Sequence, residues 1–537
     1  MASASPALSP TPPPSLVHEK LAKGPGKIGI ALFGLILVVG LGYIGLQLAS
    51  DLSVVKSPSV YPFLLLGVAL MVALGFEFVN GFHDTANAVA TVIYTHSLNP
   101  HVAVVLSGTL NFVGVLMSTG AVAFSIITLL PVELILQVGR GAGFAMVFAL
   151  LTAAILWNLG TWYFGLPSSS THTMVGSIIG VGIANQLMST KSGTSGVDWG
   201  QAGNVGKTLL ISPLVGFVAA ALLLLLIKVI IPDRRLYQAP EGDQPPPFWI
   251  RCLLILTCSG VSYAHGSNDG QKGMGLIMLI LVGTVPTAYA LNHAIPASQV
   301  QTFIAVSDRA NETLSRYVSP DAVMGDPAEE VTAYIRTRQF NASTMLALRE
   351  MVDGVANELN YWKELAKVPA DRVPNLRNDM YIISEALRLM QKSHAGQITT
   401  ADWEALSNYK KQIDGATKFI PLWVKVAVAL ALGLGTMIGW KRIVVTVGEK
   451  IGKDHLTYGQ GAAAEITAMA TIAAADMYGL PVSTTHVLSS GVAGTMAANR
   501  SGLQMGTLRN LAMAWILTLP ASILMSAGLY WAFRSIG

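Results

Sequence analysis

Polar side chains interrupt apolar stretches of this sequence at two related places. The first place carries a glutamate, an aspartate, a histidine and two asparagines: Glu77, Asn80, His83, Asp84 and Asn87. An ionisable residue at membrane depth costs at least a few kcal/mol, so it is read as functional unless it faces water at a helix end. Asp84 has a counterpart, Asp269, in a similar later segment. A carboxylate there can bind a cation or accept a hydrogen bond from a protonated anion.

A proline followed by small hydroxyl residues forms a second kind of motif. It reads LPSSSTH at residues 166–172 and returns as LPVSTTH at residues 480–486. This pattern favours a loop that leads into a new short helix with Ser or Thr at its N-cap. Free N–H groups at a helix start can hold an anion. Two helix N-termini, each surrounded by hydroxyl side chains, would suit a tetrahedral oxyanion. The alternative is that the hydroxyls only bond helix carbonyls.

Other residues of the motifs could tune this chemistry. Lys272 stands where the first segment has Asn87, and it could supply fixed positive charge or pair with a nearby acid. Histidine can titrate near neutral pH and relay protons. For His172 and His486, a neutral ring that braces the loop is the preferred interpretation. No spacing typical of a zinc site or a hydrolytic enzyme is present.

The segments that carry these motifs are long and apolar. The chain has 537 residues, of which 52% are hydrophobic and only 12% charged, against about 25% charged in soluble domains. Apolar runs of membrane-spanning length occupy residues 28–48, 61–78, 101–130, 144–164, 208–231, 249–262 continuing into 273–288, 421–438 and 508–533. The class is therefore an all-α polytopic membrane protein, in contact with membrane lipid. Its net charge of +4 gives no reason to expect a nucleic-acid partner.

The two halves of the chain repeat each other. The hydroxyl motif recurs at an offset of 314 residues, and the segment around Asp84 recurs around Asp269 at an offset of 185. The difference, 314 − 185 = 129, is about the length of a charged, helix-forming region at residues 292–418. We therefore expect two homologous repeats with broken or re-entrant helices, Gly81 allowing one break, and a soluble helical insert.

This organisation divides the chain into five parts. Residues 1–27 form an N-terminal cytoplasmic tail and residues 28–50 an extra first span, because basic residues precede an uncleaved apolar run. Residues 61–291 hold the first membrane half and the start of the second repeat. Residues 292–418 form the insert, and residues 419–537 complete the second repeat.

The motifs resemble those of the inorganic phosphate transporter (PiT) family, in its bacterial low-affinity Pit type. The resemblance rests on residues 81–90 (GFHDTANAVA), residues 262–275 (SYAHGSNDGQKGMG) and the two hydroxyl motifs. It implies inverted repeats, a phosphate site between them, alternating access, a homodimer and a multi-pass location in the bacterial inner membrane. It also implies no enzymatic activity and no resident cofactor.

The resemblance also implies the site residues. Phosphate would be bound by residues of all four motifs: Asp84, Asn87, Ser169, Ser170, Thr171, Asp269, Ser483, Thr484 and Thr485, with Lys272 added from its position in the repeat. Proton or cation coupling would involve Asp84, Asp269, Glu77, His83 and Asn268, and a co-transported metal would meet Asp84 and Asp269. The family's first motif usually has Asn where this chain has His83, which argues against a fully sodium-type site.

Several functions remain open at this point. The leading hypothesis is proton-driven phosphate import, in which the anion travels as a neutral complex with a divalent metal. Sodium coupling and a sulfate permease on the same scaffold are the alternatives within transport. A membrane receptor or scaffold, in which the insert binds a partner, is the alternative from another class.

Overall fold

The structure is a computed structural model. It describes residues 21, 24, 26–53, 61–84, 86–130, 134–135, 141–188, 197–240, 242 and 244–536, without the side chains of residues 86, 87, 141, 142 and 536. The prediction for the tail at residues 1–27 therefore lies almost wholly outside the described residues.

Eight α-helices of the described chain precede residue 240. They are α2 (Lys27–Leu52), α3 (Tyr61–Asp84), α4 (Ala86–Tyr94), α5 (Pro100–Met117), α6 (Ala121–Ile127), α8 (Gly141–Tyr163), α9 (Ser170–Met188) and α10 (Trp199–Ile230), followed by the 3-10 turn η1 (Arg234–Tyr237). The second half contains α11 (Phe248–Thr284), α12 (Pro286–Tyr289), α18 (Leu422–Thr436), α19 (Lys441–Glu449), α20 (Tyr458–Met477), α21 (Thr484–Ala498) and α22 (Met505–Ile536).

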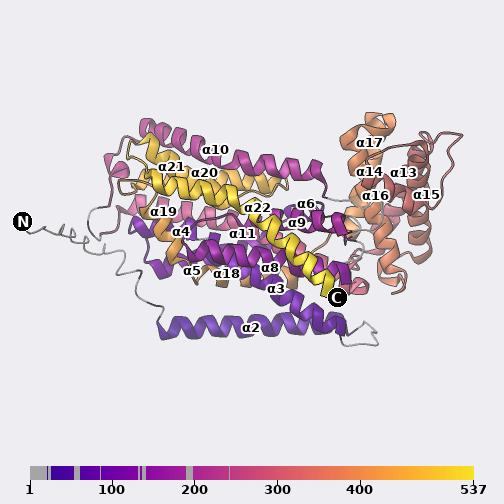
Figure 1. Ribbon diagram of the computed structural model, residues 1–537, viewed down its shortest axis with the longest axis horizontal. Coiled ribbons are helices and arrows are strands. Elements are labelled where there is room, and N and C mark those ends of the chain that lie inside the picture. The colour runs from indigo at the N-terminus through magenta and orange to yellow at the C-terminus, as the bar shows by residue number, and fades with distance from the viewer. Residues whose placement is uncertain are drawn as a thin grey trace, which may run out of the picture.

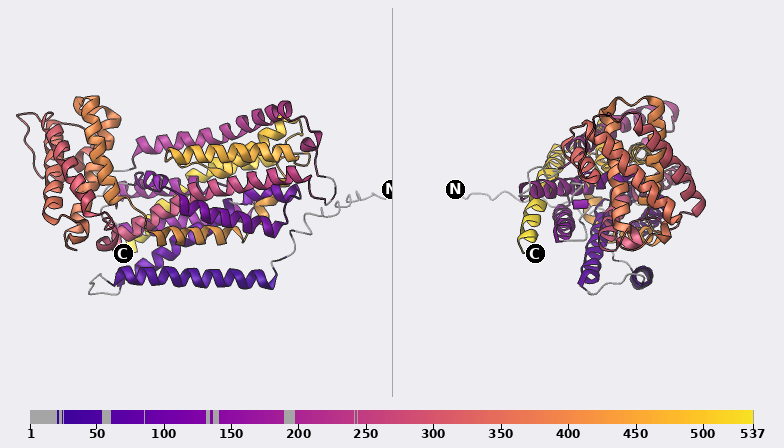
Figure 2. Two further views of the ribbon diagram at one scale, coloured as in Figure 1. Left: turned by 180° about the vertical axis from the view of Figure 1, so that it is seen from behind. Right: turned by 90° about the vertical axis from the view of Figure 1, so that its right-hand side faces the viewer.

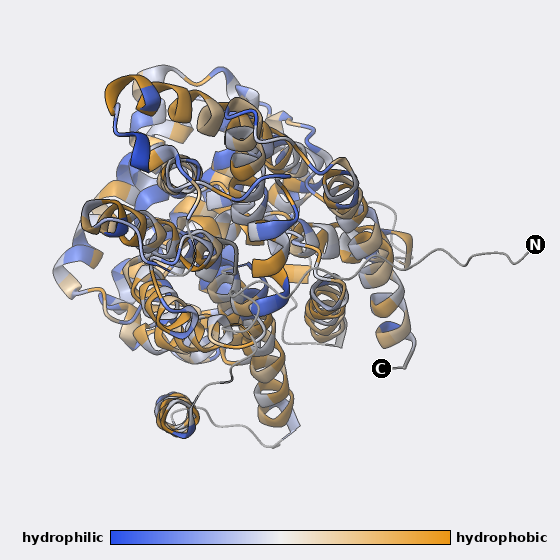
Figure 3. Ribbon diagram, turned by 90° about the vertical axis from the view of Figure 1, so that its left-hand side faces the viewer, coloured by the Kyte–Doolittle hydropathy of each residue, from blue (hydrophilic) through white to orange (hydrophobic). Residues whose placement is uncertain are grey.

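Seven helices of the described chain are long and apolar enough to cross a membrane, and a bent pair of helices would make eight. These helices run side by side along the long axis of the molecule (Figure 1). Viewed end on, hydrophobic segments predominate among them (Figure 3). The predicted class, an all-helical polytopic membrane protein, is confirmed.

The extra first span, α2, lies apart from the other helices (Figure 1). Its close approach is to α18, where Leu430 packs against Gly40. At its C-terminal end, Asp51 accepts hydrogen bonds from Tyr289 Oη at 2.5 Å and Trp423 Nε1 at 3.1 Å. Most of the α2 surface is therefore not covered by the other described helices.

Residues 292–418, predicted as an insert, contain α13 (Ala297–Ser315), α14 (Pro327–Thr337), α15 (Ala342–Trp362), α16 (Val373–Ser393) and α17 (Thr400–Thr417), with the 3-10 turns η2 (Leu365–Lys367) and η3 (Ala395–Gln397). They form a bundle at one end of the molecule (Figure 2). The bundle returns to the membrane part through a 72° bend between α17 and α18.

The two halves exchange helices. The long helix α10 of the first half packs on α21 of the second, and α22 of the second half packs on α9 of the first. A Cβ atom on Gly180 would lie 2.2 Å from the Ile523 carbonyl oxygen, and one on Gly494 would lie 2.1 Å from the Phe217 carbonyl oxygen. Gly180 and Gly494 are repeat partners, so the close helix contact is duplicated with the sequence.

The helix ends fall at different residues from the glycine and the apolar run that the sequence singled out; α3 ends at Asp84 and α4 begins at Ala86. Gly81 lies inside α3, which continues to Asp84; a Cβ atom at Gly81 would lie 2.2 Å from the Leu432 carbonyl oxygen, so its small size serves helix packing. The apolar run at 101–130 is not one helix: α5 ends at Met117, and Gly120, with φ of +88°, starts α6.

Candidate functional site

The two hydroxyl motifs begin helices that meet end to end. In both halves the serine before the helix accepts a hydrogen bond from a backbone N–H three residues later, Ser169 from His172 at 3.2 Å and Ser483 from His486 at 3.1 Å. Thr171 Oγ1 donates to the Val482 carbonyl oxygen at 3.0 Å, which joins the two helix starts. The predicted N-caps therefore exist, and they converge.

The histidines at the helix starts stack on each other. The ring centroids of His172 and His486 are 4.5 Å apart, and the His486 ring lies 4.2 Å from that of Trp515. Both histidines are buried. This arrangement suits the predicted bracing role, in which the rings hold the two helix starts together.

Asp84 lies at this meeting point. Its carboxylate accepts hydrogen bonds from Ser170 Oγ at 2.5 Å and Thr485 Oγ1 at 2.6 Å, one hydroxyl from each motif. His83 Nδ1 lies 3.1 Å from the same carboxylate, and His83 Nε2 lies 3.1 Å from Thr161 Oγ1. A residue of the first polar segment is thus bonded to both halves of the molecule.

Asp269 shares the site but has a different neighbour. Its Oδ2 is 2.8 Å from Lys272 Nζ and 3.4 Å from His265 Nε2, and Ser170 Oγ lies 3.5 Å away. Lys272 also donates a hydrogen bond to Thr171. The lysine is fully buried, so its charge is held inside the protein between the second carboxylate and the first hydroxyl motif.

Several polar atoms in and beside this cluster have no hydrogen-bond partner among the described residues. They include Thr484 Oγ1 and Asp269 Oδ1, both on buried residues, and one ring nitrogen each of His172 and His486. A buried polar atom without a partner costs about 1–3 kcal/mol, so such atoms are uncommon in folded proteins unless something else binds them. Their presence in and beside the cluster makes it the candidate binding site.

Three carboxylate or imidazole groups in the cluster could hold a cation. Ligand atoms of Asp84, His265 and Asp269 lie within 4.8 Å of one another, and all three side chains are buried. The sequence singled out the two aspartates as possible cation ligands but not His265, which lies in the motif at residues 262–275. Its spacing of four residues from Asp269 on a helix was the available signal.

The remaining predicted residues lie around this cluster. Glu77 is buried against α11, where a Cβ atom at Gly273 would lie 2.4 Å from Glu77 Oε1. Asn268 donates to the Leu480 carbonyl oxygen at 3.3 Å rather than to the carboxylates. Asn87 lies in α4, and its side chain is outside the described residues.

Among the described residues of the membrane part, sequence reasoning missed one buried acid. Glu465 on α20 is fully buried and accepts a hydrogen bond from Thr257. A glutamate inside the apolar stretch of residues 458–477 was a sufficient signal.

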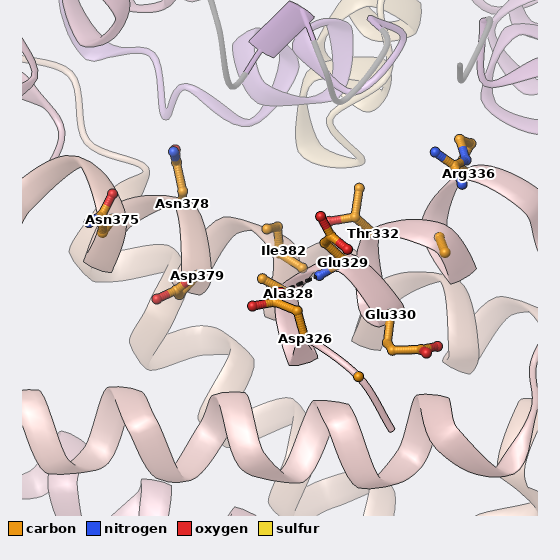
Figure 4. Close-up of a pocket in the computed structure, with 12 residues that line it drawn as sticks. Asp326, Ala328, Glu329, Glu330, Thr332, Arg336, Asn375, Asn378, Asp379 and Ile382 are labelled. Atoms are coloured by element: carbon orange, nitrogen blue, oxygen red, sulfur yellow. Dashed lines mark hydrogen bonds between the residues drawn. The ribbon is translucent and has the colours of Figure 1, made fainter. Parts of the chain in front are cut away.

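The insert has a hollow of its own. A cavity of about 830 Å³ lies between α14 and α16, lined in part by Asp326, Glu329, Glu330 and Asp379 (Figure 4). None of its lining residues belongs to the duplicated motifs. The candidate site is therefore the buried cluster and not this open, acidic hollow.

A multi-pass helical membrane protein with a buried polar site between two halves is the class that these observations define. The sequence matches the model of the phosphate transporter family over residues 80–526. The chain belongs to the phosphate transporter family.

Two curated relatives come from Escherichia coli (strain K12). The chain is similar to its low-affinity inorganic phosphate transporter PitA, at 41% identity over 87% of this chain and 96% of the relative. It is similar to PitB at 40% identity, over 88% and 97%. A solved structure described as the sodium-dependent phosphate transporter aligns at 20% identity and a TM-score of 0.48, covering 88% of this chain and 100% of the other.

Proposed function

We propose that this protein imports inorganic phosphate across a bacterial inner membrane by proton symport, with alternating access between its two halves. The observation that supports this most is the meeting of two hydroxyl-rich helix starts at a pair of buried carboxylates. The family membership and the relatives named as phosphate transporters support the substrate.

The anion would be held by groups that donate hydrogen bonds. Thr484 Oγ1 lacks a protein partner among the described residues, and Lys272 adds one buried positive charge. The backbone N–H groups at the starts of α9 and α21 favour negative charge. Together these groups suit a tetrahedral oxyanion that carries several acceptor oxygens.

The carboxylates would distinguish phosphate from sulfate. Asp269 Oδ1 has no partner among the described residues, so it can accept a hydrogen bond from the P–OH group of protonated phosphate. Sulfate carries no proton near neutral pH and would face the carboxylate without a bond. Excess unlabelled sulfate is therefore expected not to compete with labelled phosphate; effective competition would favour a sulfate permease.

The same carboxylates would carry the coupling cation. Two carboxylates and one lysine around one point leave negative charge that a proton or a metal ion can balance. Asp84, His265 and Asp269 form a suitable ligand set for a divalent ion that accompanies phosphate as cargo. Glu77 and His83 lie next to this set and would pass the proton onward.

Reconstitution tests the choice of coupling ion. Purified protein in proteoliposomes is expected to take up labelled phosphate under an imposed inward proton gradient without sodium, and more so with Mg²⁺ present. No uptake under these conditions, with uptake restored by a sodium gradient, would establish the sodium-coupled alternative.

The proposal includes a homodimer. Chemical cross-linking in native membranes, followed by mass measurement of the detergent-solubilised protein, is expected to give twice the mass of one chain. A single-chain mass at all protein concentrations would contradict it.

A further inference from the structure

Each half of the molecule presents a hairpin tip to the site. Tip 1 is the turn between α8 and α9, residues 164–169, and tip 2 is the turn between α20 and α21, residues 478–483. Each tip leads directly into the helix start that carries the hydroxyl residues of the site. Whatever holds a tip against its neighbours therefore decides when the site is covered.

Tip 1 is held by an aromatic contact together with hydrogen bonds. The ring of Trp162 lies 5.2 Å from that of Phe82, and its Nε1 donates to the Gly439 carbonyl oxygen at 2.7 Å. Thr446 Oγ1 donates to the Gly165 carbonyl oxygen at 2.7 Å. Separating the aromatic pair would expose apolar surface, which costs roughly 25 cal/mol for each Å².

Tip 2 is held by polar side chains at the equivalent positions. Asp476 accepts hydrogen bonds from Ser267 Oγ at 2.6 Å and from Gln271 Nε2 at 2.5 Å. Gln271 Oε1 in turn accepts the backbone N–H of Val122 at 2.9 Å, which ties α20 to α11 and α6. By the repeat offsets, Ser267 corresponds to Phe82 and Asp476 to Trp162, so one contact is built from opposite chemistry in the two halves.

The two contacts differ in the cost of opening. Asp476 is half-buried, so water can replace its hydrogen bonds as the tip lifts. The net contribution of such a hydrogen bond is then small. Water cannot replace the contact between the rings of Trp162 and Phe82 in this way. Tip 2 is therefore the less costly of the two to release.

We propose that Asp476, Ser267 and Gln271 form a polar latch, and that release of this latch lifts tip 2 while tip 1 remains closed. This inference rests on the proposed alternating access. It makes Asp476 and Gln271 positioning residues, which act through tip 2 on the hydroxyls of the second motif.

Cysteine labelling tests the latch. The chain without native cysteines, C252S/C258S, would carry either Val482→Cys in tip 2 or Ser168→Cys, its repeat partner in tip 1. Both positions are buried. The rate of alkylation by a water-soluble maleimide in proteoliposomes then reports how often each tip opens, and phosphate uptake is measured on the same samples.

Gln271→Glu sets a carboxylate against Asp476 and removes the donor. It is expected to raise labelling of Val482→Cys on the order of tenfold, the effect of one lost hydrogen bond plus like-charge repulsion, and to change labelling of Ser168→Cys less than about twofold. Adding Asp476→Asn restores the hydrogen bond with donor and acceptor exchanged, because the introduced amide N–H at position 476 donates to the introduced carboxylate at position 271. The oxygen of the amide can still accept a hydrogen bond from Ser267. The double variant is expected to label like the parent.

Equal increases at both cysteines, no increase at Val482→Cys, or failure of the double variant to restore protection would each overturn the latch. If Gln271→Glu does not fold, Ser267→Ala removes one donor and is expected to act in the same direction by roughly threefold. Labelling does not depend on which ion drives transport. A parent that labels as expected but takes up no phosphate would contradict the proposed function and leave the latch intact.

Discussion

The two halves of this protein share a backbone plan but differ in how they hold their carboxylates. Asp84 ends α3 and is bonded to two hydroxyls and a histidine, whereas Asp269 lies inside the unbroken α11 and is paired with Lys272. Duplication preserved the helix contacts at Gly180 and Gly494. It did not preserve the charge next to the carboxylates, because Lys272 stands where the first half has Asn87. The two carboxylates of the candidate site therefore have unlike surroundings.

The largest expected effect comes from removing either carboxylate. Asp84→Asn and Asp269→Asn are each expected to lower phosphate uptake roughly a hundredfold, because each breaks two or more charge-assisted contacts worth about 1.5–3 kcal/mol apiece. Initial rates of labelled phosphate uptake measure this, with protein amount in the membrane as the control. Normal transport by both variants would show that the site is elsewhere.

The second-largest effect on uptake is expected when the two halves are made alike at the position of Lys272. Lys272→Asn copies Asn87 into the second half and leaves Asp269 without its ammonium partner. We expect stability to fall by about 3 kcal/mol, since breaking a buried ion pair leaves an uncompensated charge, and uptake to fall roughly tenfold. Lys425→Asn is a matched control, because that lysine bonds only the Ser118 carbonyl among its described contacts. Equal effects of the two variants would remove Lys272 from the site.

The hydroxyls allow a finer comparison. Thr171→Ser and Thr485→Ser keep the donor and are expected to change uptake less than about twofold. Thr485→Val should lower uptake more than Thr171→Val, because Thr485 donates to a carboxylate and Thr171 to a carbonyl oxygen. The phosphate concentration at half-maximal uptake measures both. The reverse order would indicate that Thr171, through Lys272, binds phosphate more directly.

The smallest effect is expected in the insert. Burial, with the nearby charges of Asp326 and Glu358, raises the pKa of Asp379 to about 6. An acid with a raised pKa in the folded state destabilises the fold above that pH and ceases to do so below its unfolded pKa near 4. Asp379→Asn should therefore stabilise the insert at pH 7 by roughly 1 kcal/mol after solvent screening, with the gain lost between pH 6 and 4. Hydrogen exchange of α16 in both proteins measures this, and uptake is expected to be unchanged.

Much of the fold and of the site could be predicted from local patterns. Apolar runs identified the membrane helices, and the duplicated LP motifs identified the capping serines Ser169 and Ser483. These features depend on residues close together in sequence.

What could not be predicted depends on contacts between distant segments. No pattern places Lys272 beside Thr171, or both Ser170 and Thr485 on Asp84. Glycine weakens helices, which favours a break at Gly81, but the role of this residue is set by Leu432, which lies more than three hundred residues later. The opposite membrane orientation of the repeats stays a prediction.

The exchange of helices has a consequence for biosynthesis. The helix α9, which carries the first hydroxyl motif, buries its glycine face only when Ser522 and Ile523 of α22 arrive. During translation the first half is therefore in the membrane without its partner helix α22, and its polar residues stay exposed until nearly the whole chain has been inserted. A ribosome that stops early would leave a fragment that cannot hide those residues, and membrane quality-control proteases could recognise it by that exposure.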